Sequence, residues 1–372
     1  MKNLRALLSL GLSGVCFLTG CSSVSRKTEV LAVMEKAADW QLANPSQTWK
    51  SDLWHNAAFY TGVMALGEIT AEPRYLAAMM KMGEGNGWRP AARLYHADDH
   101  AVGQTYLDLH RLRRDPAMIA PLRERFDFIL AHPKDDNLLF NPDPLAKPDH
   151  LDRWSWCDAL FMSPPAWAKL SQATGDTRYL DYAVRQWWVT SDYLYDPADH
   201  LYLRDSRYFT RREKNGAKVY WARGNGWVLG GLVRMLEAMP PDHPSRARLV
   251  AQFREMAARI AGLQSPDGFW RASLLDAAAF PMQESSGTGF FCYGLAWGVN
   301  AGLLDRKQYE PVIRRAWAAL LTCVNPDGRL THVQPVGFTP VTFDPEATEP
   351  YGVGAFLLAG RQMHRLFTTY RP

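Results

Sequence analysis

Cysteine and net charge are both scarce in this chain, and each shortage excludes a class of protein. Beyond residue 21 the 372-residue sequence contains only three cysteines, Cys157, Cys292 and Cys323. Their odd number and scattered spacing argue against a disulfide framework or a cysteine-based metal site and predict buried thiols. The formal net charge is +4, and no basic stripe or RNA-binding motif is present. Nucleic acid is therefore not expected as a partner.

Aromatic residues, in contrast, are plentiful. The chain has 14 Trp, 15 Tyr and 16 Phe in a composition that is 47% hydrophobic and 22% charged. This composition is typical of a globular protein long enough for one large domain or two ordinary ones. Most of the rings must lie in the core, but the surplus of Trp and Tyr also suits the apolar faces of sugar rings.

The N-terminus has the pattern of an export signal. A basic start with Lys2 and Arg5 precedes an apolar stretch, residues 6–18, that is too short to span a bilayer. Leu18-Thr-Gly-Cys21 then has the spacing of a lipoprotein cleavage box. We expect residues 1–20 to be a signal peptide, Cys21 to be lipidated and residues 21–27 to be a tether to the membrane. This predicts an exported bacterial lipoprotein, periplasmic or outer-membrane associated; an ordinary signal peptide cut nearby is the alternative.

Residues 28–372 show helical periodicity without a clear break in composition, which predicts a single domain. Residues 70–76 and 174–180 resemble each other and lead into helices, and Ser265-Pro-Asp-Gly268 and Asn325-Pro-Asp-Gly328 are turns with a left-handed glycine. A unit of roughly 50–60 residues recurs, so about six stacked helical hairpins are expected. We predict an all-α fold closed into an (α/α)6 barrel rather than an open solenoid. Apolar residues recur at helical spacing in segments 32–42, 56–66, 102–112, 159–173, 228–239, 246–263, 289–301, 312–323 and 352–367.

The stretch Arg153-Trp-Ser-Trp-Cys-Asp158-Ala-Leu-Phe-Met162 places one carboxylate among rings and apolar side chains. Burial beside Trp154, Trp156 and Phe161 removes water from Asp158. The loss of water raises its pKa, as a general acid working near neutral pH requires. A helix N-cap is the alternative role for this aspartate.

A second cluster, Trp221-Ala-Arg-Gly-Asn-Gly-Trp227, combines a guanidinium, an amide and two indoles. Arg223 can hold both oxygens of a substrate carboxylate at once. Asn225 is expected to bind ring hydroxyls, and Trp221 and Trp227 to provide stacking faces. Together the two clusters predict a sugar-binding acid/base site. In the alternative interpretation Arg223 pairs with an acid and the tryptophans are core.

These segments resemble the unsaturated rhamnogalacturonyl hydrolases of glycoside hydrolase family 105, which are relatives of the unsaturated glucuronyl hydrolases. The resemblance is carried by segments 156–165, 221–228, 285–290 and 352–360 in the family's order, and it extends from about residue 30 to the C-terminus. It implies an (α/α)6 barrel that removes a 4,5-unsaturated uronic acid from the non-reducing end of lyase products. Pectic rhamnogalacturonan is the substrate source that the resemblance favours.

The resemblance also implies a mechanism. Asp158 protonates C4 of the enol ether, water adds at C5, and the resulting hemiketal rearranges and expels the remaining sugar. Asp158 can then act as the base that activates the water. The anomeric bond is not attacked, so the carboxylate-separation rule for ordinary glycosidases does not apply. No redox step occurs, and no cofactor is required.

A second acid is expected in Tyr95-His-Ala-Asp98-Asp99-His100. Adjacent residues point in different directions, so one of Asp98 and Asp99 is expected to face the site while the other caps a helix. His100 is a candidate contact to the substrate. Two histidines, His96 and His100, beside two aspartates also suggest a metal site, but no third region matches and we expect hydrogen bonding instead.

Further contacts are expected from Trp156 and from Trp54 as walls of the site, and packing in the core is the alternative role for Trp54. Where several members of the resembled family have a histidine-containing segment, this chain has Leu203-Arg-Asp205-Ser-Arg207, and Asp205 or Arg207 is expected to supply that contact. Residues 284–288 are predicted to be a polar loop entering a helix, for which capping by Ser286 or Thr288 is the alternative.

Three alternative functions remain open at this stage. A non-catalytic glycan-binding surface lipoprotein would use the tryptophans only as a platform, but it gains nothing from a desolvated Asp158. An inverting glycosidase or a sugar epimerase on the same barrel would share the fold, because fold alone does not decide function.

Overall fold

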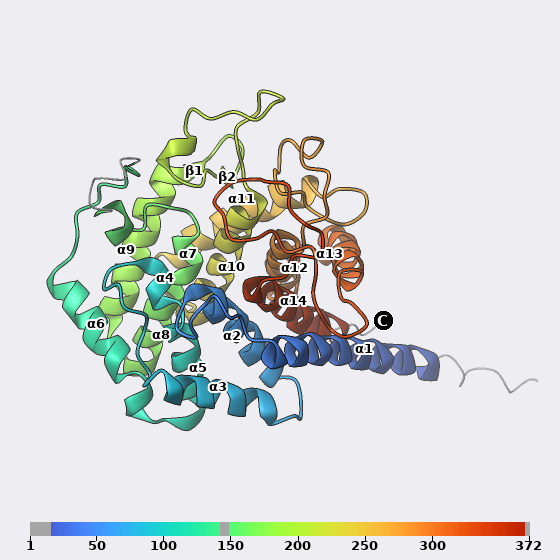
Figure 1. Cartoon of the computed structure of the whole chain (residues 1–372), viewed down its shortest axis with the longest axis horizontal. Helices are drawn as coiled ribbons and strands as arrows, with labels where there is room; N and C mark the ends of the chain where they lie inside the picture. The colour runs from blue at the N-terminus through green and yellow to red at the C-terminus, as the bar shows by residue number, and fades with distance from the viewer. Residues whose placement is uncertain (1–15, 142–148, 369–372) are drawn as a thin grey trace, which may run out of the picture.

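The computed structural model describes residues 16–141 and 149–368. Twelve longer helices of this part of the chain alternate between an outer and an inner ring (Figure 1). The outer helices are α1 (Cys16–Ala43), α3 (Arg74–Gly85), α6 (Ala120–Ala131), α9 (Thr177–Leu194), α11 (Arg246–Gly262) and α13 (Arg306–Leu321). The inner helices are α2 (Trp54–Gly67), α5 (Gly103–Arg113), α8 (Pro164–Thr174), α10 (Ala222–Ala238), α12 (Ser285–Asn300) and α14 (Pro350–Thr368).

Burial explains which helix joins which ring. Inner helix α12 is composed of small, aromatic and apolar residues and is buried over almost its whole length, whereas outer helix α9 buries one face only. The last inner helix, α14, packs against the first, α2, and so closes the ring. A side chain at Gly354 would place its Cβ 2.3 Å from the Ala58 carbonyl oxygen, which explains the glycine at this close approach. The predicted (α/α)6 barrel is confirmed.

Short elements fill the connections that lead from an outer helix into the next inner one. They include α4 (Ala97–His100), α7 (Ala159–Met162), η2 (Asp149–Asp152), η3 (Ser206–Tyr208) and a hairpin of β1 (Tyr195–Asp196) with β2 (Leu201–Tyr202). A further turn, η1 (Pro116–Met118), precedes α6, the one outer helix that was not predicted from the sequence. Helices α3 and α9 lie outside the predicted periodic segments too, but each follows one of the two similar connections that were expected to lead into a helix. Inner helices α10 and α12 begin several residues earlier than predicted, which changes the direction of the side chains in their first turns.

The two predicted proline-glycine turns have the same structure. Gly268 and Gly328 adopt φ values of 91° and 101°, as predicted. Each glycine also approaches the next outer helix, because a Cβ there would lie 2.4 Å from the carbonyl oxygen of Arg315 or Lys36 respectively. The turns therefore fasten one hairpin to the next.

The predicted N-terminal signal falls largely outside the described residues, since its residues 1–15 are not among them. Helix α1 begins at Cys16, so residues 21–27, the predicted tether, have a helical backbone continuous with the barrel's first helix. Among the described residues no helix is both long and apolar enough to cross a membrane. The three predicted thiols, Cys157, Cys292 and Cys323, are buried and unpaired.

Candidate active site

A cavity of about 260 Å³ lies at the end of the barrel where inner helices α2 and α10 begin. It contains seven of the predicted site residues: Trp54, Asp98, Trp156, Asp158, Trp221, Arg223 and Trp227. Met162, Arg204 and the segment Val336–Phe338 complete its walls. Residues far apart in the sequence are brought together because each stands at the start of an inner helix or in the connection just before one.

Asp158 occupies the N-cap position of α7, as the alternative interpretation expected, but its side chain makes no capping hydrogen bond and so does not act as a cap. Its Oδ2 lies 3.6 Å from Nε of Arg204 and accepts a hydrogen bond from the Cys157 thiol at 3.4 Å. Burial raises the pKa of Asp158, and the Arg204 guanidinium opposes part of that rise. Of the three rings predicted to desolvate it, Trp156 lines the cavity, whereas Trp154 packs against Tyr182 and Phe161 packs against Trp227.

Asp98, and not Asp99, is the second acid of the cavity. Asp99 turns away and accepts hydrogen bonds from the backbone N–H of Arg93 at 2.7 Å and from its Nε at 3.1 Å. Burial raises the pKa of Asp98 to about 7, and the carboxylate of Asp158 adds to the rise against the opposing charge of Arg93. Two carboxyl groups with raised pKa values therefore share one small cavity.

Neither histidine near this turn contacts the cavity. The ring of His100 lies between Ser163 Oγ at 2.7 Å and the Leu94 carbonyl oxygen at 2.9 Å, so the predicted substrate contact is wrong and its role is to hold α4 in place. Burial lowers the pKa of His96 to about 3 and that of His100 to about 4. Across residues 16–141 and 149–368, no three His, Cys, Asp or Glu side chains converge on a possible metal position.

Arg223 lines the cavity between two rings, at 4.4 Å from the Trp221 ring centre and 4.9 Å from that of Tyr351. Its terminal nitrogens already donate to backbone oxygens, Nη1 to Gln334 and Nη2 to Pro335 at 2.9 Å. Arg223 therefore clamps the segment that forms one wall of the cavity. Its Nε is buried and has no partner among the described residues.

Arg204 is a second cation of the cavity, and it was not predicted from the sequence. Asp205, which was predicted to contact the substrate, is fully buried and does not line the cavity. It accepts from Arg204 Nη1 at 2.6 Å and from Arg207 Nε and Nη2, both at 2.9 Å. Asp205 is thus a positioning residue, and the sequence Arg-Asp-x-Arg was the signal for such a cluster.

Asn225 is also structural. Its Oδ1 accepts from the backbone N–H of Tyr202 at 2.7 Å and its Nδ2 donates to the Tyr202 carbonyl oxygen at 3.0 Å. Because α10 begins at residue 222, Asn225 faces β2 and not the cavity. The prediction that its amide binds ring hydroxyls is wrong.

The polar segment 284–288 forms the start of α12. Glu284 is its N-cap and accepts from the backbone N–H groups of Ser286 at 2.9 Å and Gly287 at 2.7 Å. Capping by Ser286 or Thr288, the alternative weighed for this segment, is therefore not observed. Ser285 holds the connection before α14, because its backbone N–H and Oγ bind the carbonyl oxygens of His332 and Thr331.

A buried amide supports the short helix that carries Asp158. Gln104 of α5 donates to the carbonyl oxygens of Phe161 at 2.8 Å and Met162 at 3.2 Å, the groups that a helix end leaves without partners. Its Oε1 accepts from Nε of Arg234 at 2.5 Å. This chain of contacts fixes α7 from the barrel interior.

Replacing Gln104 with methionine is expected to lower kcat by about tenfold, because a small displacement of a catalytic group is costly. Steady-state kinetics and thermal unfolding would measure the effect. Gln252→Met is the matched control, since Gln252 is equally buried but bonds to Trp187 and Tyr202. It should lose stability and keep kcat; an equal loss of kcat in both variants would contradict a positioning role for Gln104.

Comparison with known proteins places this site in a family. Residues 25–367 match Glycosyl Hydrolase Family 88. An unsaturated 3S-rhamnoglycuronyl hydrolase of Formosa agariphila is 37% identical over 98% of this chain and 100% of the relative. Another of the same description, from an Alteromonas species, is 37% identical over 88% and 84% respectively.

Solved structures agree with the sequence comparison. A family 88 glycosyl hydrolase from Bacteroides vulgatus has a TM-score of 0.83 at 30% identity, covering 91% of this chain and 99% of that one. A protein described as a polysaccharide lyase has a TM-score of 0.84 at 33% identity, covering 93% and 99%. A possible family 105 member from Salmonella enterica shares the fold, with a TM-score of 0.74 at 20% identity, covering 92% and 95%. The match over nearly the whole sequence and the full-length relatives show that this chain belongs to Glycosyl Hydrolase Family 88 and is a glycosidase.

Proposed function

We propose that the protein removes a 4,5-unsaturated uronic acid from the non-reducing end of an oligosaccharide. The observation that carries this proposal is a pair of carboxyl groups, the buried Asp158 and the partly buried Asp98, in one cavity with two arginines. A raised pKa keeps a proton available near neutral pH for the protonation of carbon. A platform that only binds glycans has no use for such a pair.

The chemistry needs one proton donor and one base. Asp158 delivers a proton to C4 of the enol ether, and the ring oxygen stabilises the cation that forms at C5. Water then adds at C5 and gives its proton to the Asp158 carboxylate, which restores the starting acid. The hemiketal opens, and the hemiacetal at C1 releases the remaining sugar. Asp98 shares the cavity and favours the protonated state of the pair.

The substrate carboxylate has a natural position near Arg204 and Arg223. Both α2 and α10 begin at this cavity without a capping side chain, so the positive ends of two helices also face it. The positive charge of Arg204 lowers the pKa of Asp158. A bound carboxylate would offset this charge and so raise that pKa further. Substrate binding is therefore expected to favour protonated Asp158.

The proposal also names the sugar from which the unsaturated uronic acid is cut. Elimination at C4 removes the stereocentre that distinguishes glucuronate from galacturonate, so both give the same unsaturated uronic acid. Specificity must then depend on the sugar bonded to it. The names of the relatives at 37% identity support rhamnose as this sugar. A rhamnose-linked uronide polymer, pectic rhamnogalacturonan included, is the proposed source.

The proposed location is that of an exported lipoprotein. It is supported by the cleavage-box sequence Leu18-Thr-Gly-Cys21 after a short apolar stretch. Wild-type protein is then expected in the membrane fraction of its bacterial host, and Cys21→Ser in the soluble exported fraction. A membrane-bound Cys21→Ser variant would contradict lipidation at this residue.

The test of the activity is the loss of enol-ether ultraviolet absorbance from unsaturated uronyl-rhamnose disaccharides. Unsaturated disaccharides lacking rhamnose provide the comparison. A polysaccharide lyase, as one similar structure is described, would instead create absorbance from a saturated polymer. Binding without any change in absorbance would favour the glycan-binding alternative, and cleavage of saturated disaccharides would favour an ordinary inverting glycosidase.

A further inference from the structure

The connection between β2 and α10, residues 203–221, carries an excess of positive charge. It contains six Lys or Arg and two Asp or Glu, so its net charge of +4 equals that of the whole chain. Figure 1 shows it as the yellow-green loop above β2. Its second residue, Arg204, lines the catalytic cavity, so the excess charge begins at the active site.

The two acids of this connection are used within the protein. Asp205 is buried and binds the two arginines beside it, and Glu213 accepts a hydrogen bond from Ser273 Oγ at 2.7 Å. Because these acids interrupt the segment, it was not predicted as a basic stripe. In the part of the chain that the structure describes, no carboxylate lies within ion-pair distance of the exposed Arg211 or Arg212. Their charge is therefore open to an anionic partner.

Aromatic rings interleave with the arginines of this connection. The guanidinium of Arg207 lies 3.9 Å from the ring centre of Phe140 and 5.3 Å from that of Phe338. Phe338 is 47% exposed and belongs to the wall of the catalytic cavity. Its carbonyl oxygen accepts from Tyr208 Oη at 2.8 Å, and the guanidinium of Arg211 lies 4.7 Å from the Tyr208 ring centre. A path of contacts, the arginine-aromatic strip, thus leads out of the cavity through Arg204, Phe338, Arg207, Phe140, Tyr208 and Arg211.

The strip suits the part of a substrate that extends beyond the leaving sugar. In a polymer of alternating rhamnose and uronate, the sugar after the leaving rhamnose carries a carboxylate. A guanidinium can hold both oxygens of a carboxylate, and aromatic rings pack against the C–H faces of sugars. An acidic oligosaccharide offers both kinds of group to a surface on which guanidiniums and rings alternate.

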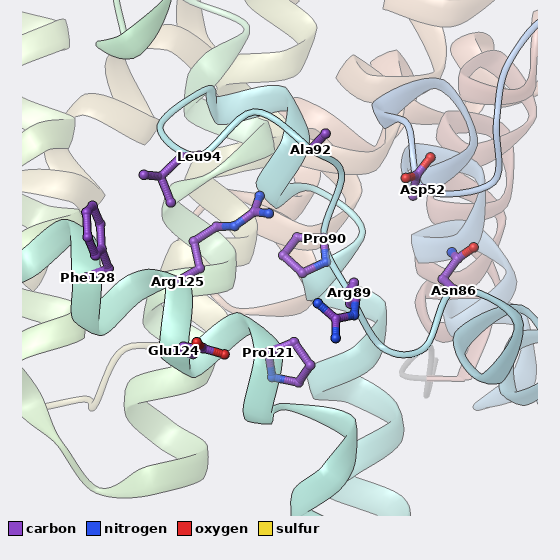
Figure 2. Close-up of a pocket in the computed structure, with 10 residues that line it drawn as sticks. All are labelled: Asp52, Asn86, Arg89, Pro90, Ala92, Leu94, Pro121, Glu124, Arg125 and Phe128. Carbon is purple, nitrogen blue, oxygen red and sulfur yellow. The ribbon is translucent and has the colours of Figure 1, made fainter.

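A larger cavity of the protein does not compete for an anionic chain. It has a volume of about 590 Å³ and lies between α6 and the loop that leads from α3 to α4. Figure 2 shows four charged residues in its lining, Arg89, Arg125, Asp52 and Glu124. Two positive charges are therefore balanced by two negative ones. Arg125 is also engaged by the loop, because its Nη1 donates to the Ala91 carbonyl oxygen at 2.6 Å.

We propose that the arginine-aromatic strip is a subsite for the outer sugars of acidic oligosaccharides longer than a disaccharide, with Arg211 as the ligand of the next uronate carboxylate. The proposal rests on the proposed function for the alternation of uronate and rhamnose, and it adds the length of the substrate. A basic surface beside the cavity raises the local concentration of anionic chains. Unsaturated tetrasaccharides are therefore expected to be cut before disaccharides.

The test compares an unsaturated tetrasaccharide of alternating uronate and rhamnose with the unsaturated disaccharide, by the loss of enol-ether absorbance. At low ionic strength the wild type is expected to have a kcat/KM about fivefold higher for the tetrasaccharide, a gain that an exposed charge pair can supply. Arg211→Glu should abolish this preference, and Arg211→Lys should keep most of it. Salt at about 0.5 M should also remove the preference, because exposed charges are screened. The ratio of the two kcat/KM values cancels any effect on the catalytic cavity itself.

Arg248→Glu is the matched control. Arg248 is also exposed, and its guanidinium lies 3.5 Å from the ring centre of Trp188. It stands in the first turn of α11, which follows the end of α10 that is far from the catalytic cavity. The same change of charge at this position should leave the ratio of the two kcat/KM values as in the wild type.

Three results would overturn the proposal. They are equal kcat/KM values for both substrates in the wild type, a preference that Arg211→Glu leaves unchanged, and an equal loss of preference in Arg248→Glu. Absence of turnover of either substrate would instead refute the proposed function. Calorimetry with a saturated tetrasaccharide of the same polymer would then decide on the strip, with a Kd about fivefold lower for the wild type than for Arg211→Glu as the expected result. Equal Kd values would overturn the strip alone.

Discussion

Replacing Asp158 with asparagine is expected to reduce kcat by about 10³-fold, within the range that a positioned acid or base contributes. Asparagine keeps the size and polarity of the side chain but carries no transferable proton. The loss of enol-ether absorbance gives kcat and KM directly. KM is expected to change little, because Arg204, Arg223 and the aromatic walls of the cavity remain.

The same substitution distinguishes the two acids. If Asp98 were the proton donor, Asp98→Asn would show the larger loss of kcat and Asp158→Asn the smaller one. Asp99→Asn is a control for the local structure, since Asp99 is equally buried but bonds only to the loop through Arg93. More than a tenth of wild-type kcat in Asp158→Asn would rule out the assigned role.

The barrel was predictable because its determinants are repeated along the sequence. Helical periodicity occurs in nearly every hairpin, and the two turns at Gly268 and Gly328 repeat a motif with a known backbone requirement. Closure of the ring was predicted from the number of hairpins. In the structure it depends on contacts between α2 and α14, which lie near opposite ends of the chain. Helix α6 was missed because its packing, with only three fully buried residues, leaves a weak apolar pattern.

The residue types of the site were predicted from the sequence, but the directions in which several of their side chains point were not. A residue type indicates what a side chain can do, but the direction in which it points depends on where its helix begins. Asn225 and Asp205 both satisfy neighbouring protein groups. Asn225 was assigned to the substrate because an amide suits ring hydroxyls, and Asp205 because it stands where members of the resembled family have a histidine-containing segment. Conversely Arg204 reaches the cavity because Asp205 holds it there, a relation between neighbours that the sequence contained but that needed a structure to orient.

Asp98→Asn is expected to make the protein more stable above pH 7 while it lowers activity. The pKa of Asp98 is about 7 in the folded protein and about 3.9 in an unfolded chain, so the folded state keeps a proton that the unfolded state loses. The stabilisation from this proton is complete below about pH 4 and is lost as the pH rises to about 7. Above that pH the folded protein must hold a buried carboxylate.

An asparagine at position 98 does not ionise, so the variant lacks this pH dependence. Relative to wild type its free energy of unfolding should rise by about 2–4 kcal/mol between pH 4 and pH 8. Urea unfolding at both pH values would measure it, with Asp158→Asn as comparison. Asp158→Asn removes the like charge beside Asp98, so the pKa of Asp98 should fall in that variant. Its free energy of unfolding relative to wild type should therefore also rise between pH 4 and pH 8. Parallel pH profiles for wild type and Asp98→Asn would mean that Asp98 is already ionised in the folded state. Asp158, the assigned proton donor, would then hold the one proton of the pair.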